Sequence, residues 1–219
     1  MERYGELSEG AWFFIPSKYD SLFNEAKELF ESEGAKKLQE FLDRKYFSLL
    51  SEISKQTDVP LFINYSKSKI DFYNLMLVLR MDKIARRNTR LTKEMIEQEM
   101  REGLMDGGSL PLEDCIDFYK MSVNKKKEFI RNSKYDSYLT EGMKVYGYDY
   151  DLSILERCMD NYLITMCKEN KNIALGPEPI FGYLMGRKYE MINIRLILTS
   201  TFLNVPESII KERLRETYV

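Results

Sequence analysis

The chain has 219 residues, of which 44% are apolar, so it is long enough for one large or two small domains with a real core. Its 33 basic and 35 acidic residues leave a net charge of −2, which gives no electrostatic argument for nucleic acid or for an anionic membrane surface. It contains no histidine, which excludes Ser-His-Asp and Cys-His catalysis and the histidine-based metalloprotease motif.

The first part of the chain shows apolar residues at helical spacing. Residues 12–15, bounded by a proline, are expected to close a short helix rather than to form a strand. A helix is predicted over 18–32 and a longer one over 35–55, with Gly34 interrupting them. A further, very apolar helix is predicted over 69–85.

A capped helix is expected after a short polar connection. Thr92 is a suitable N-cap for a helix through Glu102, because its side-chain oxygen can accept a hydrogen bond from a first-turn N–H. Gly103, Gly107 and Gly108 follow, and glycine supplies the left-handed conformation that often ends a helix.

The second half of the chain also shows apolar residues at helical spacing. Helices are predicted over 112–121, over 125–146 with a break near Asn132, over 152–169 and over 206–216. No stretch alternates apolar and polar residues with turns at strand spacing. The predicted fold class is therefore all-α.

The segment 176–198 is the one around which we expect the chain to be organised. It begins with a proline-rich turn, continues as a helix through Tyr183 and is expected to break near Gly186. The helix that follows, over 191–203, is apolar on nearly every side. Such a helix is normally central and buried.

This segment has an earlier copy, found by moving back 119 positions without a gap. The matched pairs are Pro179 with Pro60, Phe181 with Phe62, Lys188 with Lys69, Asn193 with Asn74, Leu196 with Leu77, and Leu198 with Leu79. A self-match of this kind indicates a duplicated helical unit. We therefore predict two tandem helical repeat units, over 1–105 and 106–219.

Two motifs that could bind a ligand are rejected on their spacing. The run from Gly182 to Lys188 resembles a phosphate loop but lacks the required spacing, the lysine position and the Ser/Thr that follows it. The run from Asp149 to Ser153 begins like a calcium loop, but Ile154 stands where glycine is required. We read the first as a helix break and the second as a helix cap.

The cysteines do not form a metal site. Cys115, Cys158 and Cys167 are irregularly spaced and have no histidine to complete a ligand set, so buried free thiols are expected. No run of 18 apolar residues exists, and Met1 to Gly5 does not resemble a signal peptide.

Short basic runs occur at Lys125 to Lys127 and at Arg86-Arg87, with Arg90 nearby. A solvated helix face accounts for most runs of this kind, and a protein contact accounts for the rest. Nucleic acid is not expected as a partner, because the aromatic residues are not interleaved with these charges.

Polar residues inside the apolar copies point to a structural network. Asn74 and Asn193 occupy equivalent positions, and a buried amide must be hydrogen-bonded, so each is expected to tie its helix to a neighbouring backbone. Asp71 and Glu190, one turn earlier, and Arg195 could join this network. The two acids fall in different units, which favours a structural role over paired acid/base chemistry.

These features resemble the C subunit of the V-type/A-type ATP synthase, which is the counterpart of the d subunit of the eukaryotic vacuolar ATPase. The residues that carry the resemblance are Gly176 to Pro179, Gly182 to Gly186, Glu190 to Leu198, Pro206-Glu207 and Ile210 to Leu214. Further matching stretches are Leu42 to Arg44, Tyr46-Phe47, Asp71 to Leu75 and Gly107 to Leu110.

The resemblance implies a non-catalytic rotor part of a rotary ATPase. Members of the family have three such units, so the N-terminal one is expected to be lacking here. The implied partners are the D and F subunits of the central stalk and the membrane proteolipid ring, which would hold the protein peripherally at the cytoplasmic face of the membrane. No catalytic, cofactor-binding or metal-binding residues and no cofactor are implied.

A second hypothesis is an all-helical enzyme or small-ligand binder that uses tyrosines and carboxylates. Its candidate residues are Tyr135, Tyr138, Tyr146, Tyr148 and Tyr150. A deep pocket with converging acids would favour this enzyme, whereas an open surface would favour the rotor part.

Overall fold

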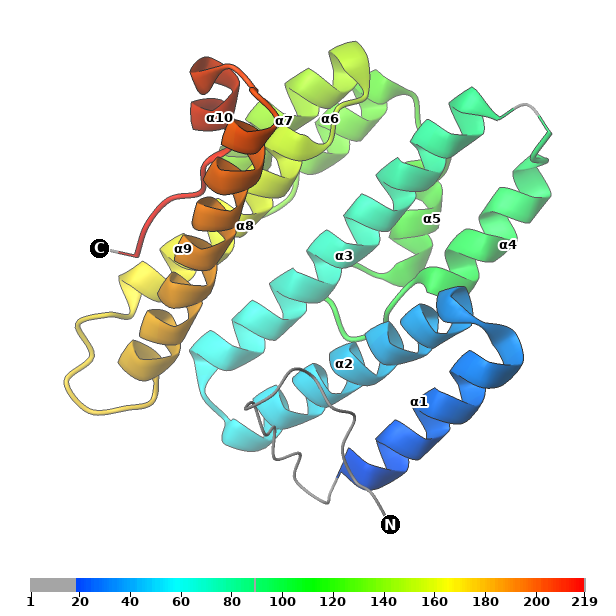
Figure 1. Cartoon of the computed structure of the whole chain (residues 1–219). Coiled ribbons are helices and arrows are strands. Elements are labelled where there is room, and N and C mark those ends of the chain that lie inside the picture. Colours follow the sequence, from blue (N-terminus) through cyan, green and yellow to red (C-terminus); the bar gives the residue numbers. More distant parts are fainter. Residues whose placement is uncertain (1–18, 89, 219) are drawn as a thin grey trace. The chain divides into compact units, whose positions relative to one another are not determined.

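The computed structural model describes residues 19–88 and 90–218, and this part of the chain forms ten helices and no strand (Figure 1). The helices in chain order are α1 (Asp20–Glu33), α2 (Ala35–Thr57), α3 (Pro60–Arg87), α4 (Lys93–Gly103), α5 (Leu112–Lys120), α6 (Val123–Arg131), α7 (Asp136–Asp149), α8 (Ser153–Glu169), α9 (Glu178–Phe202) and α10 (Glu207–Arg213). The all-α prediction is confirmed. The short helix expected over 12–15 lies outside the described residues.

The chain divides into two compact units, Met1–Tyr46 and Phe47–Val219, with the boundary inside α2. In the first unit α1 buries no side chain, and Gly34, with φ of 85°, follows its last turn as predicted. The predicted repeat units 1–105 and 106–219 follow a similarity of sequence rather than of contacts, and they stay a prediction.

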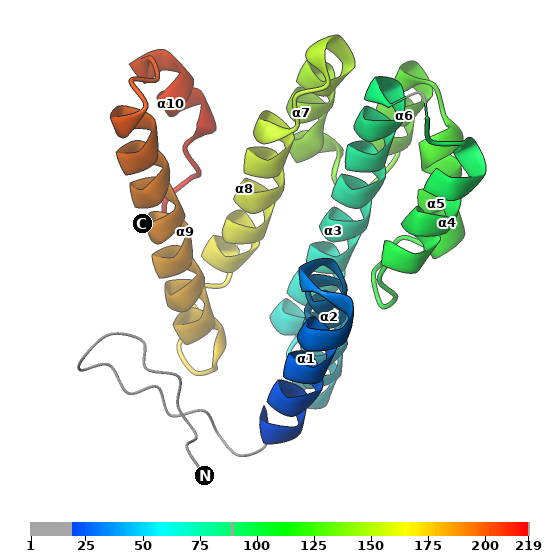
Figure 2. The same ribbon diagram turned by 45° about the vertical axis from the view of Figure 1, so that its right-hand side comes forward.

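Helix α3 is the centre of the second unit. Helices α4, α5 and α8 pack against it, and its buried side chains lie on nearly all of its sides. The largest apolar cluster joins α3 to α5, α7 and α8 through residues such as Phe72, Leu75 and Leu79. In Figure 2, α3 lies between the α7–α8 pair and the α4–α5 pair.

Several predicted helix ends are confirmed and others differ. The helix predicted over 69–85 extends over Pro60–Arg87 as α3. The Thr92 hydroxyl accepts a hydrogen bond from the Met95 N–H at 3.2 Å, and residues 132–135 separate α6 from α7. Helix α4 ends in extended backbone at Leu104 rather than at a left-handed glycine. Helix α10 ends at Arg213, three residues before the predicted end.

The predicted break at Gly186 is wrong, since α9 is one continuous helix. Gly182 and Gly186 are buried within it, and the ring of Tyr218 lies against both. A Cβ atom built at Gly182 would lie 2.6 Å from the Tyr218 hydroxyl oxygen, and one at Gly186 would lie 2.5 Å from Tyr218 Cβ. These glycines therefore let the C-terminal segment approach α9 closely.

The predicted burial of 191–203 is also wrong. Within α9 only Gly182, Gly186, Tyr189 and Ser200 are buried, whereas Met191, Leu198 and Phe202 are exposed. The physical reason is that the described helices that contact α9, chiefly α8 and α10, cover a single side of it. An apolar surface on every side permits a helix to be central but does not supply the elements that would surround it.

The two repeated asparagines bind backbone as predicted. The Asn74 side chain donates to the Met105 carbonyl at 2.8 Å and accepts from the Met105 N–H at 2.9 Å. Asn193 makes the same pair of bonds with Arg215, both at 2.9 Å. Each asparagine thus holds the extended segment that follows the next helix, α4 or α10, against its own helix.

We expect Asn74→Ala to destabilise the protein by about 2–6 kcal/mol, because it leaves the buried N–H and C=O of Met105 without partners at roughly 1–3 kcal/mol each. Asn193→Ala should cost less, about 1 kcal/mol, since water can reach this half-buried site. Urea unfolding measures both values. The control is Asn124→Ala at an exposed position, and a loss for Asn74→Ala no larger than the control's would contradict the prediction.

Candidate functional site

The first buried polar network centres on Asp71. One carboxylate oxygen accepts from the backbone N–H groups of Ser109 and Leu110 at 2.8 and 2.9 Å, and the other accepts from the Tyr135 hydroxyl at 2.5 Å. This fully buried acid therefore joins α3 to the segment before α5 and to the start of α7. A buried carboxyl group is unfavourable unless donors such as these bind it.

The counterpart of Asp71 in the second copy behaves differently. Glu190 pairs with Arg187 on the surface of α9, one turn away. Arg195 is exposed and does not join the Asn193 bonds in the described part of the chain. Asp71 binds Ser109 and Leu110, a few residues beyond the Met105 that Asn74 binds, and the two side chains share no hydrogen-bond partner among the described residues. The prediction of one shared network is wrong for Glu190 and Arg195.

The second buried network centres on Asp82. Lys126 Nζ donates to it at 2.8 Å, the Tyr146 hydroxyl at 2.6 Å and Arg86 Nε at 3.2 Å. Lys126 is fully buried, so the predicted solvated face for Lys125 to Lys127 is wrong at its middle residue. Burial alone would raise the pKa of Asp82, but its bonds to Lys126 and Tyr146 and the nearby positive charges hold this pKa below its ordinary value.

The tyrosines of the enzyme hypothesis do not converge on one site. Tyr135 and Tyr146 are buried and donate to acids that lie 11 residues apart on α3 (82 − 71), a rise of about 16 Å. Tyr148 is exposed, and Tyr150 lies against the Arg86 guanidinium at 4.7 Å from its ring centre. These side chains link and cover helices.

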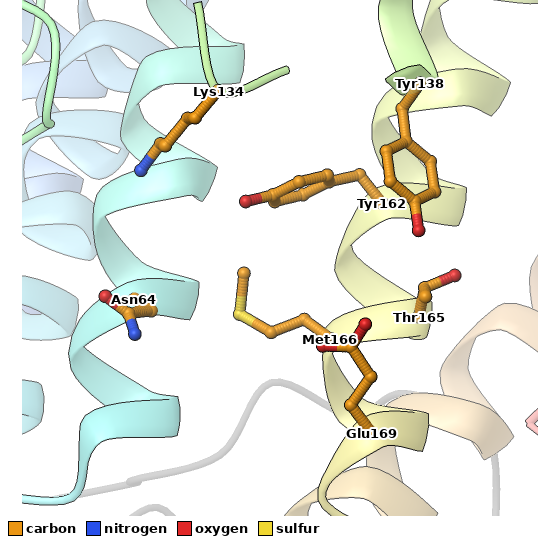
Figure 3. Close-up of a pocket in the computed structure, with 7 residues that line it drawn as sticks. All are labelled: Asn64, Lys134, Tyr138, Tyr162, Thr165, Met166 and Glu169. Carbon is orange, nitrogen blue, oxygen red and sulfur yellow. The ribbon is translucent and has the colours of Figure 1, made fainter. Parts of the chain in front are cut away.

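A cavity of about 400 Å³ lies between α3, α7 and α8. Its lining residues are Asn64, Lys134, Tyr138, Tyr162, Thr165, Met166 and Glu169. Figure 3 shows Tyr162 and Met166 reaching from α8 toward α3, while Tyr138 and Thr165 lie at the opposite edge. This lining has a single acid, Glu169, and so lacks the converging pair expected of an acid/base enzyme.

The described residues contain no cluster of acids and cysteines that could hold a metal ion. The run that begins like a calcium loop caps α8 as predicted, because Asp151 accepts from the Ser153 N–H at 3.1 Å and from its hydroxyl at 2.6 Å. Among residues 19–88 and 90–218, no helix is long and apolar enough to cross a membrane.

The strongest candidate for an interaction site is the outer side of α9, which we call the α9 face. It consists of Ile180, Leu184, Met191, Ile194, Leu198 and Phe202, all of them exposed. In Figure 2, α9 lies at the edge of this unit beside α8 and α10. A row of large apolar side chains in water is unfavourable and marks a surface suited to a partner. In the sequence, this apolar face is visible only as the apolar residues on nearly every side of 191–203.

Comparisons with known proteins agree on one family. The family profile described as "ATP synthase (C/AC39) subunit" matches residues 14–213. The chain is 23% identical over 186 residues to a protein of Methanobrevibacter smithii that is named as the C subunit of A-type ATP synthase, covering 83% of this chain and 47% of the relative. It is 25% identical over 136 residues to the C subunit of the V-type sodium ATPase of Enterococcus hirae, covering 60% of this chain and 41% of the relative.

A third relative is a protein of Thermoplasma volcanium, also named as the C subunit of A-type ATP synthase. It is 26% identical over 174 residues, or 76% of this chain and 44% of the relative. The chain therefore spans about half the length of the curated relatives it matches. No solved structure matches it significantly.

Lowering the pH should test the Asp82 network. Because the folded pKa lies below the unfolded value of about 3.9, ionised Asp82 contributes stability above that value and loses it as the pH falls through the folded pKa. We expect Asp82→Asn to cost about 3–5 kcal/mol at pH 7, since it leaves Lys126 buried without its charge partner.

This deficit should shrink below about pH 5 and disappear below the folded pKa, where the natural side chain is itself neutral. Chemical unfolding at several pH values measures it, with Asp117→Asn at an exposed position as the control. A deficit that stays constant down to about pH 2 would show that folding does not lower the pKa of Asp82, and it would contradict the prediction.

All three cysteines are buried free thiols, as predicted, and should be inert in the folded protein. Burial, assisted for Cys115 by nearby acids, raises the pKa of Cys115 and Cys167 to about 12, and burial also raises that of Cys158. At pH 8 only about one part in ten thousand of Cys115 or Cys167 is thiolate, the reactive form. A thiol-reactive dye should label none of them natively and all three in urea; rapid native labelling would contradict the burial.

Proposed function

Since this chain belongs to the ATP synthase (C/AC39) subunit family, we propose that it is a non-catalytic part of the central rotor of a V/A-type ATPase or ATP synthase. In this role it couples the D and F subunits of the central stalk to the membrane proteolipid ring, and so serves ATP-linked transport of protons or sodium ions. The observation that carries the proposal is the match of the family profile over residues 14–213.

The internal construction suits a part that transmits torque. Asp71 and Asp82 bind donors on three other segments, so α3 is cross-linked to α6 and α7 by directional bonds as well as by apolar packing. Close-packed interiors have low compressibility and transmit strain. Polar side chains that could serve chemistry are used here to fix helices to one another.

The proposal also places the protein peripherally at the cytoplasmic face of the membrane, through the ring. The α9 face supports contact with other proteins of the complex, because its exposed apolar residues would be covered by a neighbouring protein. Such a contact between proteins does not depend on which ion the complex moves.

We expect the purified chain to bind its cognate D–F stalk complex and detergent-solubilised ring, and to hydrolyse no ATP alone. Pull-down and calorimetry measure the binding, with an unrelated helical protein of similar net charge as the control. Failure to bind either partner, in a preparation where D and F bind each other, would contradict the coupling role. ATP turnover that copurifies with the chain would contradict the non-catalytic role.

A further inference from the structure

We propose that the α9 face binds a separate helical protein whose contact stripe is apolar and whose flanks carry carboxylates. The partner would cover α9 in the same way that helices α5–α8 of this chain cover the matching side of α3. The inference goes beyond the proposed function, since it names the face and the chemistry of its occupant, and it holds even if the stalk proteins bind elsewhere.

Helices α3 and α9 hold an extended backbone segment at the same position and in the same way. Asn74 and Asn193, 119 positions apart (193 − 74), each exchange two hydrogen bonds with one residue of an extended segment. Those segments begin at Leu104 and Leu214, which both have φ of −67°. Residues that match at this offset therefore point to equivalent sides of the two helices.

Matched side chains differ in exposure between α3 and α9. Phe72, Leu75 and Leu79 on α3 are 4%, 1% and 1% exposed, and their counterparts Met191, Ile194 and Leu198 on α9 are 59%, 49% and 65% exposed. The same contrast holds for two further pairs, Leu61 with Ile180 and Tyr65 with Leu184. The side chains are apolar in both copies, and only one copy is covered.

Aromatic rings and neighbouring helices cover this side of α3. The ring of Phe72 packs against those of Tyr135 and Tyr162, with centres 4.8 and 5.4 Å apart, and α5 and α8 lie along the helix. The covering element is therefore a set of helices. Because α3 and α9 match in this way, a helical partner fits the α9 face.

The spacing along α9 supports the same conclusion. Leu184, Met191 and Leu198 recur every seven residues, and so do Ile180, Arg187, Ile194 and Thr201 between them. Two such rows, three and four residues apart, form the seam that takes a second helix by knobs-into-holes packing. The cation in this seam, Arg187, pairs with Glu190 of the same helix, and a carboxylate on the partner would add to that pairing.

The charges beside the seam favour an acidic partner over a second copy of this chain. Arg187, Lys188 and Arg195 lie on the exposed side of α9, where Glu190 is partly exposed and already pairs with Arg187. An antiparallel α9 pair centred on Met191 would place Arg187 opposite Arg195, since the two positions are equidistant from it. A parallel pair would place each cation against its own copy. Like charges across an interface oppose association, whereas carboxylates would steer it.

The test uses two synthetic amphipathic peptides of about four heptads, with Leu and Ile at the seam and either Glu or Lys at the flanking positions. Fluorescence anisotropy with the whole chain measures their binding at about 50 mM salt, where screening is weak. We expect the Glu peptide to bind at least about tenfold more tightly than the Lys peptide, and this preference to shrink as salt is added.

Variants locate the site. Met191→Asp combined with Leu198→Asp should weaken binding of the Glu peptide at least about tenfold, and Arg187→Glu with Lys188→Glu should reverse the preference between peptides. Leu175→Asp, at an exposed apolar residue in the loop before α9, is the matched control and should leave binding unchanged. All these positions are exposed, and circular dichroism with thermal melting confirms that the variants fold.

Several outcomes would overturn the inference. They are no binding of the Glu peptide, equal binding of both peptides, or binding that survives Met191→Asp with Leu198→Asp. A concentration-dependent dimer of the chain that this double variant abolishes would also overturn it, because the α9 face would then belong to a second copy. None of these outcomes depends on whether the stalk proteins D and F bind.

Discussion

The second unit of this protein depends on two buried carboxylates that lie three turns apart on α3. Asp71 and Asp82 are carboxyl groups in an apolar interior, a position that is unfavourable unless each is hydrogen-bonded. Three of their donors, Tyr135, Tyr146 and Lys126, come from a stretch about 45 to 65 residues further along the chain. Correct burial of α3 therefore requires α6 and α7 to dock in one register, and the polar groups specify an arrangement that apolar packing alone leaves open.

This use of polar side chains bears on function. Asp71 with Tyr135, and Asp82 with Tyr146, hold helices together at separate places along α3. The three cysteines are buried thiols with raised pKa values. The α9 face, by contrast, is an exposed apolar row bordered by cations. A body fixed internally by directional bonds, with an uncovered apolar side on α9, is suited to a part that works by contact with other proteins.

Helices α3 and α9 share one apolar pattern, but α3 is buried on nearly all sides and α9 is exposed on one. Both helices carry apolar side chains all round, and both hold an extended segment through an asparagine. Helix α3 is surrounded because further helices follow it and pack on its second side. Helix α9 is covered on one side only by the described helices, and Tyr218 fills the space left by Gly182 and Gly186 there. The uncovered side is then the natural place for an external helix, which is the basis of the inference drawn for the α9 face.

The sequence by itself determined the all-α class, most helix positions, the Thr92 cap, the free thiols and the role of both asparagines. These depend on local spacing, on caps and on the rule that a buried amide must be paired. It also carried the family resemblance that the comparisons support. Only the tertiary structure decided that Lys126 is buried, that Gly186 lies inside a continuous helix and that Met191, Ile194, Leu198 and Phe202 face solvent. Local sequence sets which sides of a helix can be buried. Burial itself depends on which distant segments pack there, and the residues of one helix do not specify those segments.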